Sequence, residues 1–244
     1  MAAIAYRVVK AVLGPILRLL FKIRVEGIEH VPQHGPVILA SNHLSFSDSI
    51  FLPLVLDRRV IFVAKAEYFE QRKTAWFFKL MGQIPVKRGG GADSQRALES
   101  AKEVLDGGGV FAIYPEGTRS PDGRLYKGRT GVARLALDTG APVVVAAMIG
   151  TREAQPIGQV KPNFGSPVTI KFSAPLHFDR FQGSRHDPLV LRQITDEIMF
   201  ELRELSGQVY VNEYAPKKNA DTAAVAEAAP TVVKTPQVPV STAA

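Results

Sequence analysis

A histidine and an aspartate stand five positions apart in residues 41–48, directly after the apolar run 36–40. Of the five histidines, only His43 has an acidic residue at this distance, Asp48. A carboxylate so placed can orient an imidazole, which can then remove the proton of a hydroxyl group. Because the chain contains no cysteine, this chemistry would not use a cysteine nucleophile.

A second polar group, Tyr-Pro-Glu-Gly-Thr-Arg-Ser at 114–120, follows the apolar run 110–113. Gly117 lets the backbone approach a ligand closely. Arg119 offers a planar fork that suits a phosphate group. Glu116 cannot bind phosphate, so we expect it to orient Arg119 or to accept a hydrogen bond from a substrate hydroxyl. Thr118 lies between these residues, and the segment predicts a phosphate or acceptor site.

A third group, Lys87 and Arg88, leads into three consecutive glycines at 89–91, which suits an anion held in a tight loop. A solvated charged loop explains Lys87 alone equally well. Arg88 together with Arg119 favours phosphate binding. In open α/β sheets, ligands bind at the carboxyl ends of parallel strands, where these groups are expected to meet.

The elements that would position these residues follow from the hydrophobic pattern. Apolar runs predict buried parallel strands, and periodic segments between them predict helices. The expected strands are 37–40, 60–64, 110–114, 142–149 and 169–172; the expected helices are 49–56, 74–81, 94–105, 131–138 and a long final helix capped by Asp187 and Pro188. This alternation predicts one α/β domain over 25–214, with a mostly parallel central sheet flanked by helices.

The two ends of the chain differ from this domain. Residues 1–24 contain five basic and no acidic residues, and Arg7, Lys10, Arg18 and Lys22 fall on one side of a helix whose other side is apolar. This pattern predicts an amphipathic helix lying on a membrane surface; a helix simply packed on the domain is the alternative. Residues 215–244 are rich in alanine and proline and predict a disordered tail.

The formal net charge of +7 and the pI of about 9.7 favour an anionic partner. The bases gather in 1–24 and 57–91, without a recognition-helix, zinc-finger or RNA-binding pattern, so a membrane with anionic lipids is favoured over nucleic acid. The remaining histidines have no metal-ligand spacing, and no Walker loop or dinucleotide fingerprint is present. We therefore expect neither a metal nor a bound cofactor.

In combination, these motifs resemble the glycerolipid acyltransferases, in particular the lysophosphatidic acid acyltransferase group. Asn42-His43-x4-Asp48 resembles the first block of that family, residues 65–88 the second, 114–120 the third and 141–146 the fourth. Two positions depart from the family pattern. Tyr114 stands where phenylalanine is often found, and a second proline near Val145 is absent.

The resemblance implies transfer of a fatty acyl group from acyl-CoA or acyl carrier protein to the free sn-2 hydroxyl of lysophosphatidic acid. His43 would be the general base and Asp48 its orienting partner, with backbone amides near His43 or Gly117 holding the oxyanion. The enzyme would lie on the cytoplasmic face of the cell membrane as a monotopic protein. Transfer to another lysolipid or to glycerol 3-phosphate, and hydrolysis of a lipid or thioester, remain the alternatives.

Overall fold

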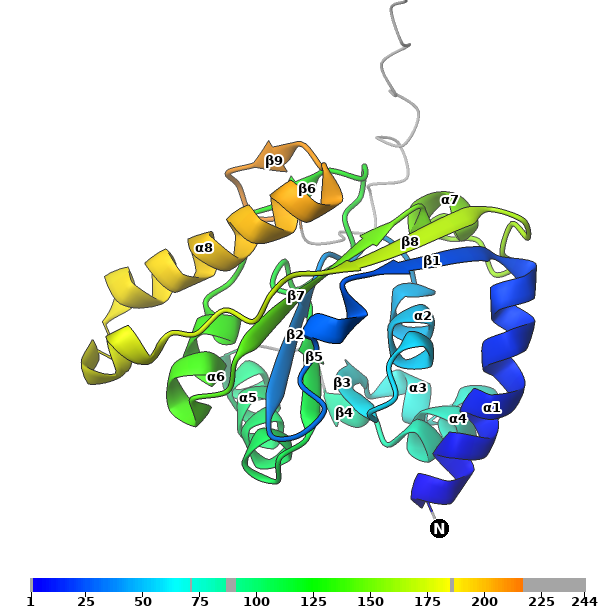
Figure 1. The fold of residues 1–244 in the computed structure, drawn as a ribbon, viewed down its shortest axis with the longest axis horizontal. Helices are drawn as coiled ribbons and strands as arrows, with labels where there is room; N and C mark the ends of the chain where they lie inside the picture. Colours follow the sequence, from blue (N-terminus) through cyan, green and yellow to red (C-terminus); the bar gives the residue numbers. More distant parts are fainter. Residues whose placement is uncertain (1, 71, 87–90, 185–186, 217–244) are drawn as a thin grey trace, which may run out of the picture.

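The central element of the computed structural model, which describes residues 2–70, 72–86, 91–184 and 187–216, is a seven-stranded sheet with helices on both faces (Figure 1). Its strands are β1 (Lys22–Glu26), β2 (Val37–Ser41), β3 (Val60–Lys65), β4 (Ile84–Val86), β5 (Val110–Ile113), β7 (Val143–Ile149) and β8 (Pro167–Phe172). They lie in the order β1-β8-β7-β2-β5-β3-β4, and every neighbouring pair is parallel except β7 and β8. The mostly parallel α/β architecture predicted from the pattern is confirmed.

The remaining elements surround this sheet. The helices are α1 (Ala2–Leu20), α2 (Asp48–Val55), α3 (Glu67–Glu70), α4 (Arg72–Met81), α5 (Gly91–Asp106), α6 (Gly131–Thr139), α7 (Thr151–Ala154) and α8 (Pro188–Ser206), with 3-10 turns η1 (Ile28–His30) and η2 (Asp179–Ser184). As predicted, α8 begins after Asp187, whose side chain accepts a hydrogen bond from the amide of Leu189 at 2.8 Å. A separate two-stranded sheet joins β6 (Leu125–Tyr126) and β9 (Tyr210–Val211).

The sheet is buried on both faces. Ile38 and Ala40 of β2 pack into a core formed with α5, α6 and α8, whereas Val37 and Leu39 pack into a second core formed with α2. Successive side chains of a strand point to opposite faces, so a strand covered on both sides needs apolar residues throughout. This explains why β2 appears in the sequence as an uninterrupted apolar run that ends at the first functional motif.

The N-terminal helix departs from the predicted two-sided pattern. It ends at Leu20 rather than near residue 24, and Lys22 already belongs to β1, the outermost strand beside β8. Lys10 does not lie among solvated bases: its amino group donates to the carbonyl of Leu56 and pairs with Asp57 at 3.3 Å. The basic side expected for this helix is therefore partly turned toward α2.

The apolar residues of α1 divide into two groups. Tyr6 and, just after the helix, Phe21 are buried against the domain. Four other apolar residues remain 46–86% exposed and recur at helical spacing: Val8, Val12, Ile16 and Leu19. We call these four residues the apolar stripe of α1. The helix thus packs on the domain and still presents a hydrophobic side to solvent.

Other differences concern short elements and the end of the chain. The predicted helices and strands are present with boundaries shifted by one to three residues, but β1, β4, β6 and β9 were not predicted. Residues 217–244, most of the predicted disordered tail, lie outside the described residues.

Candidate active site

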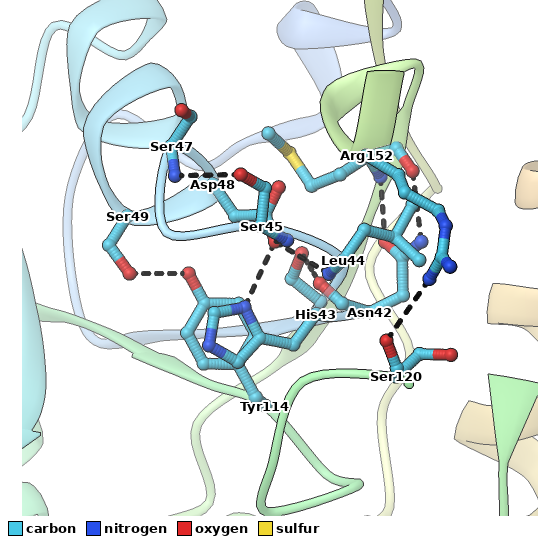
Figure 2. Close-up of polar contacts among 12 residues, drawn as sticks. Asn42, His43, Leu44, Ser45, Ser47, Asp48, Ser49, Tyr114, Ser120 and Arg152 are labelled. Atoms are coloured by element: carbon cyan, nitrogen blue, oxygen red, sulfur yellow. Dashed lines mark hydrogen bonds and ion pairs between the residues drawn. The ribbon is translucent and has the colours of Figure 1, made fainter. Parts of the chain in front are cut away.

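His43 and Asp48 are joined by a hydrogen bond of 2.9 Å between Nδ1 and Oδ2 (Figure 2). His43 follows the carboxyl end of β2 by two residues, and Asp48 opens α2, so a short loop brings them together. The Asp48 side chain is fully buried, whereas that of His43 retains 13% exposure. Because an ionised carboxylate only accepts hydrogen bonds, Nδ1 carries the hydrogen and Nε2 keeps its lone pair, which is the arrangement of a general base.

The loop between these residues is built around the carboxylate of Asp48. Its Oδ2 also accepts hydrogen bonds from the amides of Leu44 at 2.7 Å and Ser45 at 2.8 Å. These donors, together with the positive end of the α2 dipole, stabilise the ionised carboxylate. The buried Oδ1 has no hydrogen-bond partner among the described residues.

Glu116 is a buried support for the His43 loop, which corrects the prediction that it orients Arg119 or meets a substrate hydroxyl. Its Oε2 accepts from the amide of His43 at 3.2 Å, and its Oε1 accepts from the amide of Tyr126 at 2.9 Å. The side chain is 1% exposed. Both carboxylate oxygens therefore hold backbone, and they link the end of β2 to β6.

Burial, which outweighs the two amide hydrogen bonds, raises the pKa of Glu116 to about 7; the nearby carboxylates of Asp48 and Asp122 add to the rise. Between pH 4.5 and 7 the folded protein then binds more protons at this site than the unfolded chain. Its free energy of unfolding should fall as the pH rises through this range. The expected loss is on the order of 3 kcal/mol, at ~1.4 kcal/mol per pKa unit.

Urea unfolding of the wild type and Glu116→Gln at pH 4–8 tests this expectation. The variant lacks the ionisation at position 116, so the difference between its free energy of unfolding and that of the wild type should change across pH 4.5–7. Glu103→Gln, which removes an exposed negative charge from α5, controls for net charge. Parallel wild-type and Glu116→Gln curves would show that Glu116 does not titrate in this range.

Two residues that no sequence motif indicated, Gln155 and Arg152, support the loops that follow His43 and Arg119. Gln155, which follows α7, accepts hydrogen bonds from the hydroxyls of Ser45 and Ser47 through its carbonyl and its side-chain oxygen. Arg152 of α7 donates to the carbonyl of Pro121 at 3.0 Å and so supports the loop after Arg119. Gln155 lies 110 residues after Ser45, and Arg152 lies 31 residues after Pro121, so no local pattern indicates either residue.

Asn42 connects the site to the end of the domain. Its side chain forms two hydrogen bonds with the backbone of Met148 in β7, with Nδ2 donating at 2.9 Å and Oδ1 accepting at 2.7 Å. Nδ2 also donates to Gln208, whose own Nε2 donates to the carbonyl of Gly123. The residue before His43 is thus fixed to β7 and, through Gln208, to the segment after α8.

The predicted phosphate site is partly assembled. Residues 117–119 lie beside His43, because the amide of Ser120 donates to the His43 carbonyl at 2.7 Å. Gly117 has φ +75°, and a Cβ at this position would meet the side chain of Arg129 at about 3.1 Å. Arg119 is partly exposed and has no side-chain hydrogen bond or ion pair with the described residues, so its guanidinium is available to a ligand. Lys87 and Arg88 lie outside the described residues.

The amides expected to hold an oxyanion are already engaged. Those of Leu44 and Ser45 donate to Asp48, and that of His43 donates to Glu116. The amide of Gly117 donates to the carbonyl of Tyr114 at 2.9 Å. Within the part of the chain that the structure describes, the neighbouring amides of Thr118 and Arg119 donate no hydrogen bond.

The chain is similar in sequence to known proteins. Residues 22–149, just over half of the chain, match the family model described as Acyltransferase. The chloroplastic 1-acyl-sn-glycerol-3-phosphate acyltransferase of Arabidopsis thaliana is 33% identical over 170 residues, which cover 69% of this chain and 46% of that protein. The alpha form of Homo sapiens is 32% identical over 135 residues, which cover 54% and 48%. The chain thus spans about half the length of the curated relatives it matches.

A solved structure gives the same result. The crystal structure of the 1-acyl-sn-glycerophosphate (LPA) acyltransferase PlsC from Thermotoga maritima matches with a TM-score of 0.63 and 26% sequence identity. The match covers 82% of this chain and 80% of that one. From the matching family model, and with a base and carboxylate paired at the end of β2, we conclude that this chain belongs to the acyltransferase family.

Proposed function

We propose that the protein transfers a fatty acyl group from an acyl thioester to the sn-2 hydroxyl of lysophosphatidic acid, giving phosphatidic acid. The observation that carries the proposal is the hydrogen bond between His43 and Asp48, which leaves Nε2 of a partly exposed imidazole unprotonated. The names of the relatives support the acceptor. The donor, acyl-CoA or acyl carrier protein, is proposed from the resemblance of the sequence motifs to the glycerolipid acyltransferases.

In the proposed reaction, Nε2 of His43 removes the proton of the acceptor hydroxyl as its oxygen attacks the thioester carbonyl. The tetrahedral intermediate collapses, the carbon–sulfur bond breaks, and the thiolate takes a proton from the imidazolium. A thiol with a pKa of about 8.5 is a good leaving group near neutral pH. The ionised Asp48 stabilises the imidazolium between these two steps.

Direct transfer is favoured over an acyl-enzyme. The chain has no cysteine, and the hydroxyls of Ser45 and Ser47, which lie in the same loop as His43, donate to Gln155 rather than to His43. For the oxyanion we propose the amides of Thr118 and Arg119, which have no internal acceptor among the described residues. Preorganised amides of this kind stabilise the developing charge by ~3–4 kcal/mol each.

The acceptor phosphate is assigned to Arg119, and an acceptor comparison tests the whole proposal. Replacing Arg119 with Ala should raise KM for lysophosphatidic acid by ~10–100-fold, because a charge-assisted contact is lost. The rate with monoacylglycerol, which lacks the phosphate, should change little. Thiol release and product formation are measured for lysophosphatidic acid, glycerol 3-phosphate, monoacylglycerol and no acceptor.

Arg96→Ala removes an exposed arginine on α5 and serves as the control. Equal losses with both lysolipids would exclude Arg119 as the phosphate ligand. Thiol release by the wild type that needs no acceptor would instead identify a thioester hydrolase, and preference for glycerol 3-phosphate would move the activity one acylation earlier.

We further propose that the apolar stripe of α1 binds the surface of a membrane containing anionic lipids, on its cytoplasmic face. No helix within the described residues is long and apolar enough to cross a bilayer. The helix that carries the stripe contacts α4, whose Trp76 is 61% exposed; tryptophan is enriched where proteins meet the lipid interface. Arg18 is exposed on the same helix and adds attraction to anionic headgroups.

Replacing Val12 and Leu19 together with Ser should weaken binding to anionic vesicles by on the order of 10–100-fold, since two apolar side chains no longer enter the interface. Vesicle co-sedimentation measures the change. Leu189→Ser, which alters an equally exposed leucine at the start of α8, is the matched control. If both proteins sediment as the wild type does, the membrane contact lies elsewhere.

A further inference from the structure

An aromatic ring lies flat against the imidazole of His43. The rings of His43 and Tyr114 are parallel within 10°, with centroids 3.8 Å apart. Figure 2 shows the two rings lying one over the other. Phe62 of β3 stacks on Tyr114 in turn, at 5.6 Å and 20°. The three rings come from the ends of β2 and β5 and from the neighbouring strand β3, and they form one stack that ends at the proposed base.

The tyrosine ring is fixed by its hydroxyl as well as by packing. Tyr114 Oη and Ser49 Oγ are 2.8 Å apart and share a hydrogen bond. Ser49 immediately follows Asp48 in the first turn of α2, so one turn of helix holds both the partner of His43 and the anchor of the stacked ring. Phenylalanine, which is often found at this position in the family that the motifs resemble, could form the stack but not this hydrogen bond.

The stack acts on a property that a general base needs, its direction. The hydrogen bond to Asp48 fixes one atom of the imidazole, and a flat contact over the ring face fixes its plane, so the direction of Nε2 is determined. Burial and the charge of Asp48 raise the pKa of Tyr114, so the phenol stays neutral and keeps its hydroxyl for the hydrogen bond with Ser49.

We propose that Tyr114, anchored by Ser49, is a positioning residue that sets the orientation of His43. The proposal rests on the proposed role of His43 as the base. Among the described residues, the other titratable groups that contact His43 are Asp48, through the imidazole, and Glu116, through the backbone amide. Both remain in every variant used below, so a change can be attributed to the stacked ring.

Three variants separate the ring from its anchor. Tyr114→Leu removes the aromatic face, Tyr114→Phe keeps the face and removes the hydroxyl, and Ser49→Ala removes the anchor alone. Tyr210→Phe, a change of the same kind on β9, is the control. We measure kcat and KM for donor and acceptor and, without substrate, the NMR signal of the His43 Nδ1 hydrogen that is bonded to Asp48.

Tyr114→Leu should lower kcat by about tenfold, with both KM values within twofold of the wild type. The NMR signal of the His43 Nδ1 hydrogen should broaden, because a ring that is no longer held in its plane exchanges this hydrogen faster. Tyr114→Phe should keep the wild-type signal but leave kcat about two- to fivefold low. Ser49→Ala should match it, and the double variant should be no worse, because both changes break one hydrogen bond.

An unchanged signal of the His43 Nδ1 hydrogen in Tyr114→Leu would overturn the proposal, as would additive losses in the double variant. If Tyr114→Leu does not fold, the Phe and Ala variants decide through their non-additivity. The NMR measurement needs no substrate, so it stands even if the wild type transfers no acyl group to lysophosphatidic acid, a result that would refute the proposed function instead.

Discussion

Replacing His43 with Ala should lower kcat for acyl transfer by ~10²–10⁴-fold, the usual contribution of a positioned general base. No other described histidine can substitute, because His43 alone has its Nδ1 on a buried carboxylate while retaining exposure at the ring. The loss should fall on kcat rather than on KM, since the base acts on the proton in transit and not on the bound phosphate. Thiol release at saturating acceptor measures it.

His177→Ala is the matched control, because His177 is exposed on the loop before η2 and its ring makes no hydrogen bond with the described residues. Circular dichroism and thermal unfolding of both variants establish that they remain folded. Thiol release by His43→Ala at the wild-type rate would exclude the proposed mechanism, whatever the identity of the acceptor.

Asp48→Asn should reduce kcat by a comparable factor, on the order of 10³–10⁴, because the imidazolium loses its ionised partner. The amide oxygen can still accept from Leu44 and Ser45 if it takes the place of Oδ2. The amide nitrogen then occupies the position of Oδ1, which has no partner, at a cost of about 1–3 kcal/mol. The steady-state rate and the free energy of unfolding in urea give both effects.

Asp48→Ala separates stability from catalysis. It leaves the amides of Leu44 and Ser45 without an acceptor, so it should unfold more readily than Asp48→Asn, although both should be nearly inactive. An Asn variant with more than a third of the wild-type rate would show that the charge of Asp48 is dispensable. Equal stability of the two variants would show that the backbone hydrogen bonds contribute little.

The sequence pattern was sufficient where burial is complete. β2, β7 and most of β5 are covered on both faces and therefore consist of apolar residues that no helix pattern explains. The end of β2 then located His43, and the five-residue spacing to Asp48 spans only one loop. Local information of this kind survives in a single sequence, which is why the pair could be predicted.

The hydrophobic pattern failed for strands that are partly exposed, very short or paired with segments far away in the sequence. β1 alternates exposed charges with half-buried apolar residues, and its bases continue those of α1, so it was included with the helix. The strands β4, β6 and β9 have only two or three residues each, too few to show a period. The antiparallel position of β8 depends on packing that no run of residues records.

The same limit applies to Glu116. Its residue type and its place beside Gly117 and Arg119 suggested a substrate contact, and only the three-dimensional structure shows that both oxygens are occupied by amides from positions 43 and 126. The charge of Glu116 thus pointed to the motif, but its hydrogen-bond partners belong to distant segments that only the fold brings together.

The position of β1 has a consequence for folding during synthesis. Its partner in the sheet is β8, in a register that pairs Lys22 with Pro167 and Glu26 with Lys171. Closing so long a loop is slow and unfavourable until other contacts hold its ends. During synthesis β1 is made well before β8, so it must wait for β8 to emerge before it can take its place in the sheet.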